Sequence, residues 1–161
     1  MRIGVVSDTH NNLTNVARIV ELLNRARVAR VVHTGDITQA KTLEVLARLE
    51  APLVGVFGNN DRGERTALED TARRHAMELA DGPLELSLAE RRIVVVHDPR
   101  ELDVAALDFD VALHGHTHRL TIEREDGRLV FNPGECAGHV VGLNAVGVVD
   151  LITLEAEILR F

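Results

Sequence analysis

The chain has 161 residues, enough for one domain with a real core, so we expect residues 1–161 to fold as a single domain. Its formal net charge of −7 disfavours stable nucleic-acid binding, and its one cysteine excludes an internal disulfide and a thiolate metal cluster. There is no signal-peptide pattern and no apolar run of the ~20 residues that span a bilayer, which indicates a cytoplasmic protein without membrane association.

The first half of the sequence alternates between apolar strands and amphipathic helices. A strand at 2–7 is followed by a helix in which apolar residues recur at helical spacing, from Val16 to Leu23. The pattern then predicts a strand at 28–35, a helix starting at Thr38 and reaching Leu49, a strand at 52–59 and a helix at 64–77. Such alternation is typical of a mostly parallel sheet.

After Pro83 the sequence contains mainly strand-like runs. These runs cover 84–88, 91–97, 111–118, 120–125, 128–134 and 145–154. The Asp126-Gly127 pair is a typical hairpin turn, and one short helix is indicated near 102–107. We therefore expect an α/β fold with a second, mixed or antiparallel sheet and helices on the outer faces.

Polar side chains follow five of the predicted strands. In open α/β sheets, ligands bind at the carboxyl ends of strands. The oxygen and imidazole donors suit Mn, Fe, Zn or Ni, and seven donors are about right for two ions that share a carboxylate and a water. The alternative, that these residues merely populate turns, has to account for all seven. The candidate metal ligands are Asp8, His10, Asp36, Asn59, His97, His116 and His118.

The order of these motifs is D-x-H, G-D, G-N-x-D, H and G-H-x-H, which resembles the calcineurin-like metallophosphoesterase superfamily. The chain length and the N-P-G at 132–134 are similar to its small bacterial and archaeal phosphodiesterase branch. The resemblance implies a four-layer α-β-β-α sandwich with two mixed β-sheets flanked by helices. It also implies that one ion is held by Asp8, His10, Asp36 and His118 and the second by Asp36, Asn59, His97 and His116, with Asp36 as the bridge.

We therefore predict a binuclear metal-dependent phosphodiesterase. A hydroxide that bridges two divalent ions, preferably manganese, would attack phosphorus in line with the leaving oxygen. Asp36, Asn59 and His97 are the predicted catalytic residues. The expected partner is a small phosphate ester, and the chain could form a homo-oligomer. Two alternatives stay open: a phosphomonoesterase, and a non-catalytic protein-interaction module on the same fold.

Three residues depart from the family pattern. Asn60 stands where many members have a histidine that assists at the phosphate or leaving group, so no general acid can be named. Asp98 and Glu135 stand where glycine and serine are usual, and both would bring negative charge near the phosphate. Alternatively, Asp98 could form a hydrogen bond with a side chain that ligates a metal. Asp61 either orients the missing histidine or caps the following helix.

The remaining polar candidates have less direct roles. We expect His33 and His114 to be buried behind ligands, and His75 to be solvated. Cys136 and His139 could form a nucleophile pair, but a compact apolar role for the thiol is the preferred interpretation. Three arginines near the site are candidates for binding phosphate oxygens: Arg62, Arg100 and Arg119.

Overall fold

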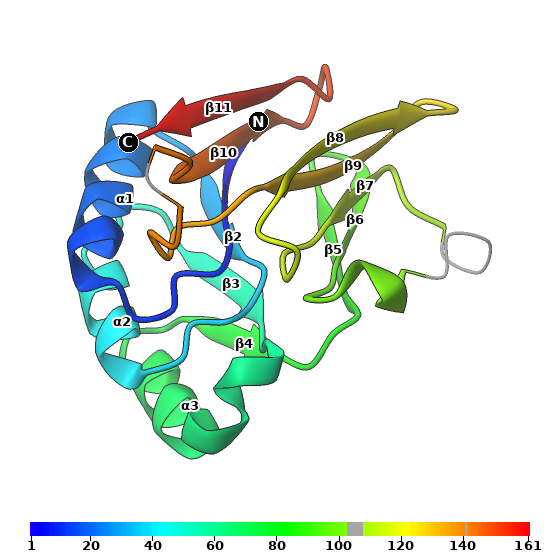
Figure 1. Cartoon of the computed structure of the whole chain (residues 1–161). Coiled ribbons are helices and arrows are strands. Elements are labelled where there is room, and N and C mark those ends of the chain that lie inside the picture. The colour runs from blue at the N-terminus through cyan, green and yellow to red at the C-terminus, as the bar shows by residue number, and fades with distance from the viewer. Residues whose placement is uncertain (103–107, 141) are drawn as a thin grey trace.

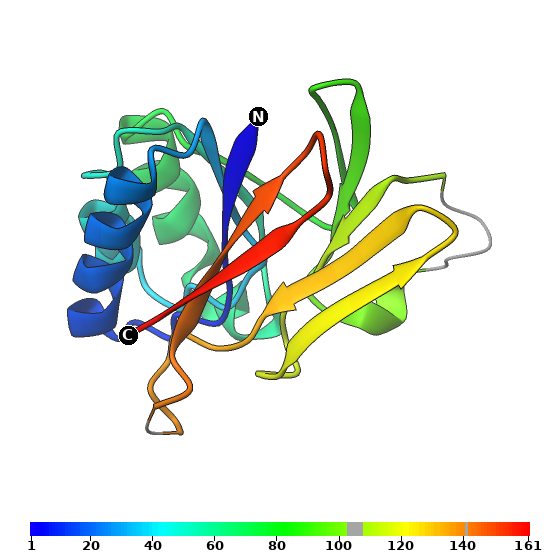
Figure 2. The same cartoon turned by 90° about the horizontal axis from the view of Figure 1, so that it is seen from above.

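The computed structural model describes residues 1–102, 108–140 and 142–161, which form two mixed β-sheets and a layer of helices (Figure 1). The strand order is β11-β10-β1-β2-β3-β4 in the first sheet and β5-β6-β7-β9-β8 in the second. Figure 2 shows the helices on the side of the first sheet that faces away from the second. The predicted α/β fold with two mixed sheets is confirmed.

The first sheet is built on four parallel strands: β1 (Arg2–Val6), β2 (Arg30–His33), β3 (Leu53–Val56) and β4 (Glu78–Ala80). Two antiparallel strands complete it: β10 (Ala145–Asp150) and β11 (Ala156–Arg160). β4 was not predicted, because three residues are too few to show a period. The single strand expected at 145–154 was wrong, since a turn after Asp150 reverses the chain into β11.

Three helices cover the outer face of this sheet: α1 (Leu13–Ala26), α2 (Ala40–Leu46) and α3 (Arg65–Arg74). α1 begins where the Asn12 side chain accepts a hydrogen bond from the Asn15 N–H, and its predicted apolar face is buried. α2 is shorter than the expected helix at 38–49, and the 3₁₀ helix η1 (Asn59–Glu64) precedes α3.

The second sheet comprises β5 (Leu84–Leu88), β6 (Arg91–Val95), β7 (Val111–Leu113), β8 (Leu120–Glu125) and β9 (Arg128–Pro133). Strands β6, β7 and β9 are parallel, and the Asp126-Gly127 turn joins β8 to β9 as predicted. β7 ends well before the expected 118, because His116 and His118 have φ values of 66° and 56°, which extended backbone does not adopt.

Apolar side chains fill the space between the sheets. Val5 and Val32 of the first sheet and Ile93, Leu113 and Phe131 of the second belong to one fully buried cluster. The outer face of the second sheet carries a smaller cluster, which includes Val94, Ala112 and Phe109 and packs against Leu102, just after the 3₁₀ helix η2 (Pro99–Glu101).

The short helix expected near 102–107 falls largely outside the described residues. Within the described part of the chain, no helix is long and apolar enough to cross a membrane.

Candidate metal centre

The carboxyl ends of β1, β2, β3, β6 and β7 meet at one edge of the two sheets, and all seven predicted ligands lie there. Backbone hydrogen bonds tie the loops together. The His10 N–H donates to the Asp36 carbonyl at 3.0 Å, and the Gly115 N–H donates to the His97 carbonyl at 3.0 Å. The strand ends of both sheets therefore contribute to a single site.

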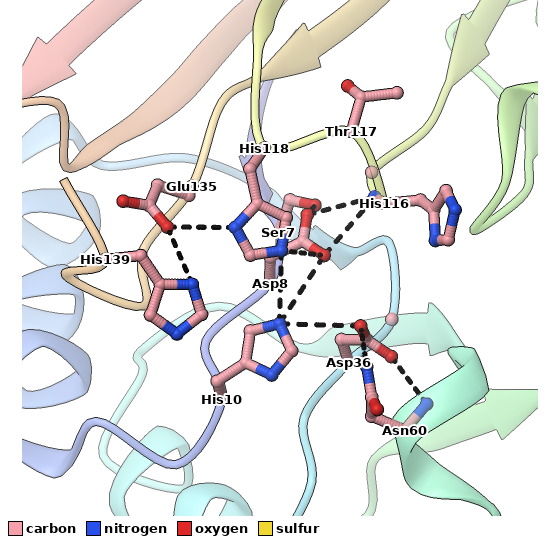
Figure 3. A network of polar contacts seen from close by, with 12 residues as sticks. Ser7, Asp8, His10, Asp36, Asn60, His116, Thr117, His118, Glu135 and His139 are labelled. Carbon is pink, nitrogen blue, oxygen red and sulfur yellow. Dashed lines mark hydrogen bonds and ion pairs between the residues drawn. The ribbon is translucent and has the colours of Figure 1, made fainter.

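Four of the side chains form a first donor group, defined as Asp8, His10, Asp36 and His118. The Nε2 atoms of His10 and His118 are 3.2 Å apart. His118 Nε2 lies 3.4 Å from Asp8 Oδ1, and His10 Nε2 lies 3.5 Å from Asp36 Oδ2. Figure 3 shows these side chains turned toward one another.

The second donor group comprises Asp36, Asn59, His97 and His116. Asn59 Oδ1 is 3.0 Å from both His97 Nε2 and His116 Nδ1. His97 Nε2 is 3.5 Å from Asp36 Oδ2, the same oxygen that lies 3.5 Å from His10. One carboxylate oxygen of Asp36 is therefore shared by the two groups.

These separations fit metal ligation. Donors bound to one ion at metal–ligand distances of about 2.0–2.2 Å lie roughly 3.0–3.5 Å from one another. The facing ring nitrogens of His10 and His118 can hold at most one proton between them in a hydrogen bond, whereas a cation satisfies both lone pairs. The oxygen and nitrogen donors suit a borderline divalent ion, so the residues present fit the metals that the sequence motifs imply.

The backbone of the site is held in an unfavourable conformation. Positive φ values occur at Asp8 (50°), His10 (40°), Asp36 (57°), His116 (66°) and His118 (56°). Each such residue costs of order 1–3 kcal/mol and persists only where surrounding structure enforces it, typically at functional sites. This concentration of strain among the proposed ligands indicates function independently of the motif.

Buried charges dominate the electrostatics. Burial raises the pKa of Asp8. Burial also opposes ionisation of Asp36, but hydrogen bonds with His97 and Asn60 outweigh it and hold the pKa of Asp36 well below its usual range. Burial disfavours the charged form of His97, yet the Asp36 carboxylate raises the pKa of His97 to about 9. In the absence of metal, a proton on His97 thus supplies part of the positive charge that the carboxylates require.

Asp61 has a role that the sequence did not reveal. Its buried carboxylate accepts hydrogen bonds from the backbone N–H groups of Asp36, Thr38 and Gly58 at 3.1, 2.7 and 2.7 Å. It therefore fastens the loop after β2 to the loop after β3 and caps η1, in which it lies, rather than capping α3. The only sequence signal for this role of Asp61 is an acidic residue close to a glycine.

His33 and His114 are buried, as predicted. His33 Nδ1 accepts from the Gly35 N–H, so its Nε2–H faces Thr9 Oγ1 at 3.2 Å. Burial lowers the pKa of His33 to about 3, so the ring is neutral. Asn132 of the N-P-G motif donates to the Gly115 carbonyl and to Thr117 Oγ1, and so supports the loop that carries His116 and His118.

The carboxylates of Glu135 and Asp98 each face a histidine. Glu135 Oε2 lies 2.9 Å from His118 Nδ1, on the far side of that ring from the donor group (Figure 3). Asp98 accepts hydrogen bonds from Arg100, and its Oδ2 lies 3.7 Å from His116 Nε2. Both carboxylates thus bring negative charge close to the proposed phosphate site, as expected, but each faces a partner: Arg100 for Asp98 and His118 for Glu135.

A cavity of about 480 Å³ opens beside the second donor group, and its lining includes Asn59, His97 and His116. Three arginines also line it. Arg100 is paired with Asp98, and Arg65 with Asp81. Arg62 forms no ion pair with any described residue, which leaves its guanidinium available to a ligand. Arg119, the third arginine noted in the sequence, is not among the lining residues.

The other sequence candidates lie outside this arrangement. Cys136 is fully buried, its thiol donates to the Ala145 carbonyl, and burial raises its pKa to about 12, so the apolar interpretation is confirmed. His75 pairs with Glu44 at 2.7 Å on the surface. His139 lies beside the first donor group, with its ring 5.2 Å from that of His118.

A family model for the calcineurin-like phosphoesterase superfamily domain matches residues 1–153. The chain belongs to this superfamily. Phosphodiesterase MJ0936 of Methanocaldococcus jannaschii is 32% identical over 155 residues, which cover 93% of both proteins. The class expected from the sequence, a phosphoric ester hydrolase of a metal-dependent family, is thereby confirmed.

Solved structures of superfamily members share the fold. The structure described as a novel archaeal phosphodiesterase has a TM-score of 0.91 and 31% identity, and each chain is covered completely. Vps29 of Entamoeba histolytica, solved with Zn²⁺, has a TM-score of 0.67 and 18% identity, with 100% of this chain and 98% of that chain covered. At that identity, the likeness to Vps29 concerns the fold alone.

Proposed function

We propose that this calcineurin-like protein is a binuclear metal-dependent phosphodiesterase. The observation that carries the proposal is the position of Asp36 Oδ2, 3.5 Å from the ring nitrogens of both His10 and His97. A carboxylate oxygen placed between two donor groups suits the bridge between two ions. When bound, two divalent ions, preferably manganese, supply a water of lowered pKa for in-line attack on phosphorus and offset the negative charge of the phosphate.

Each donor group is proposed to hold one ion: Asp8, His10, Asp36 and His118 the first, and Asp36, Asn59, His97 and His116 the second. Among these, Asp36, Asn59 and His97 are the proposed catalytic residues, since His97 Nε2 lies 3.5 Å from Asp36 Oδ2 and 3.0 Å from Asn59 Oδ1. The backbone hydrogen bonds to Asp61 hold the loops of Asp36 and Asn59 at a fixed separation, so the two groups keep their spacing.

The cavity beside the second group is proposed to receive one ester arm of the substrate. Arg62 can donate to an anionic oxygen there, because no described carboxylate neutralises it. Asn60 donates its side-chain N–H to Asp36 Oδ2 at 2.7 Å and has no titratable proton, so it cannot act as a general acid. We therefore expect diesters with good leaving groups to react fastest.

The test is Mn²⁺-dependent hydrolysis of bis(p-nitrophenyl) phosphate beside p-nitrophenyl phosphate, with wild type, Asp36→Asn and the surface control Asp70→Asn. We expect preferential diester cleavage by wild type and Asp70→Asn, and a loss of at least about a hundredfold in Asp36→Asn, because the shared ligand is weakened. Preference for the monoester would instead indicate a phosphomonoesterase. A folded wild type that binds no metal and cleaves neither ester would favour the non-catalytic alternative.

A further inference from the structure

We propose that Glu135 is a positioning residue for His118, which fixes the ring in the tautomer whose Nε2 can bind a metal. This inference rests on the proposed function, since it concerns the first donor group. It assigns a role to one of the residues that departs from the family pattern. Glu135 contacts Nδ1 of His118 and is not among the residues that line the cavity.

The geometry fixes the direction of the hydrogen bond. Glu135 is 1% exposed, and its Oε1 accepts the Val140 N–H at 2.8 Å. Its Oε2 lies 2.9 Å from His118 Nδ1. An ionised carboxylate only accepts hydrogen bonds, so the proton of His118 must reside on Nδ1. The lone pair of Nε2 is then free and points at Asp8 Oδ1, 3.4 Å away, and at His10 Nε2.

The neighbouring histidine of the same motif shows the opposite arrangement. His116 directs Nδ1 toward Asn59 and His97, and its Nε2 lies 3.7 Å from Asp98 Oδ2. Two histidines separated by one residue therefore present different ring nitrogens to the two donor groups. The contact of His116 with Asp98 exceeds hydrogen-bonding distance. A carboxylate therefore determines the tautomer of His118 strongly and that of His116 only weakly.

The difference between His118 and His116 makes Glu135→Gln the informative substitution. In Glu135→Gln, the amide oxygen can keep the bond from the Val140 N–H, and the amide NH₂ then faces His118 Nδ1. His118 can accept that hydrogen bond only by moving its proton to Nε2, which removes the metal-binding lone pair. Partners that orient a ligand histidine in this way typically change metal affinity by 10–100-fold.

The experiment uses two readouts on the full chain. Proton–nitrogen correlation spectra of histidine-labelled, metal-free protein give the tautomer of His118. Calorimetric titration with Mn²⁺ gives the affinity of each site. In wild type we expect the Nδ1–H form of His118 and two bound Mn²⁺. In Glu135→Gln we expect loss of that form and about 10–100-fold weaker binding at one site, with the other unchanged.

Asp98→Asn is the matched control, because it removes a carboxylate from the other histidine of the motif. It should retain the His118 tautomer, and both affinities should stay within about threefold, since the 3.7 Å contact is not a hydrogen bond. If Glu135→Gln does not fold, Glu135→Ala removes the acceptor without adding a donor and gives the same two readouts.

The inference is overturned if a folded Glu135 variant keeps the Nδ1–H form and wild-type Mn²⁺ affinities. It is also overturned if both sites weaken equally, because that result indicates general loss of structure. If wild type fails to bind two Mn²⁺, the proposed function fails, whereas the tautomer in metal-free protein still decides the role of Glu135.

Discussion

The charge of Asp36 is predicted to keep His97 protonated at neutral pH when no metal is bound. Their facing atoms, Asp36 Oδ2 and His97 Nε2, are 3.5 Å apart in a buried setting. Substituting Asp36→Asn removes the charge but retains the size of the side chain and its ability to accept hydrogen bonds. We therefore expect the pKa of His97 to fall by at least about two units from its value of about 9.

The magnitude follows from two opposing contributions. At 3.5 Å and an effective dielectric constant of about 20, an ion pair is worth about 5 kcal/mol. Burial of His97 opposes its charging, and the resulting shift from 6.5 to about 9 corresponds to about 3 kcal/mol. Without the Asp36 charge, burial remains and only weaker contributions from the Thr34 carbonyl and Asp8 oppose it.

The assay is an NMR titration of the His97 ring in protein stripped of metal with a chelator. Asp8→Asn is the control, and it should lower the pKa of His97 less, because Asp36 raises that pKa more than Asp8 does. A wild-type His97 that titrates at 6.5 or below would refute the reasoning. An unchanged pKa in Asp36→Asn would show that another group holds the proton.

Unfolding experiments should show the same linkage. Because folding raises the pKa of His97, its stabilising contribution is complete below pH 6.5 and is lost as the pH rises through about 9. Folding lowers the pKa of Asp36, so that contribution is present above its ordinary value of 3.8 and is lost as the pH falls further. Metal-free wild type should therefore lose stability toward urea between pH 6.5 and 9.5, and Asp36→Asn should lose much less.

Two further substitutions test the cavity and the close packing of the loops. Arg62→Gln should raise KM for a diester roughly tenfold with a smaller effect on kcat, whereas Arg119→Gln, outside the cavity, should change neither in steady-state assays. Gly115→Ala places a methyl group against Ser7 Oγ and within 2.9 Å of Asp8 Oδ2, so urea unfolding should show about 1–3 kcal/mol of destabilisation. Gly63→Ala, with open space around it, should stay within about 0.5 kcal/mol of wild type, and equal effects would contradict the packing argument.

The sequence predicted that the seven candidate ligands lie together, because each follows a strand whose apolar run is clear. The carboxyl ends of parallel strands meet at one edge of a sheet, so residues such as Asp8 and Asp36 converge without further information. Convergence of the second sheet on the same edge was less certain from pattern alone. It depends on β6 and β7 running parallel, which the structure shows.

The structure shows the residue roles that depend on the direction of side chains. Nothing in the sequence around Glu135 distinguishes a carboxylate that faces a phosphate from one that lies behind His118, because the loop after β9 carries no period. The same holds for Asp61, whose three backbone partners come from two loops: Asp36 and Thr38 precede Gly58 by 22 and 20 residues. Short strands such as β4 escape detection for a related reason, since their pairing with β3 rather than their own pattern defines them.

The carboxylates around the site are engaged by hydrogen-bond donors, and Asp98 is in addition paired with a cation. Asp61 is satisfied by three backbone N–H groups, Asp98 by Arg100, and Glu135 by His118 and a backbone N–H. Among the proposed metal ligands only Asp8 and Asp36 are carboxylates, against the four positive charges that two divalent ions would bring. Attraction of phosphate should consequently follow metal occupancy rather than the net charge of −7, and inorganic phosphate should bind the metal-loaded protein and not the metal-free one.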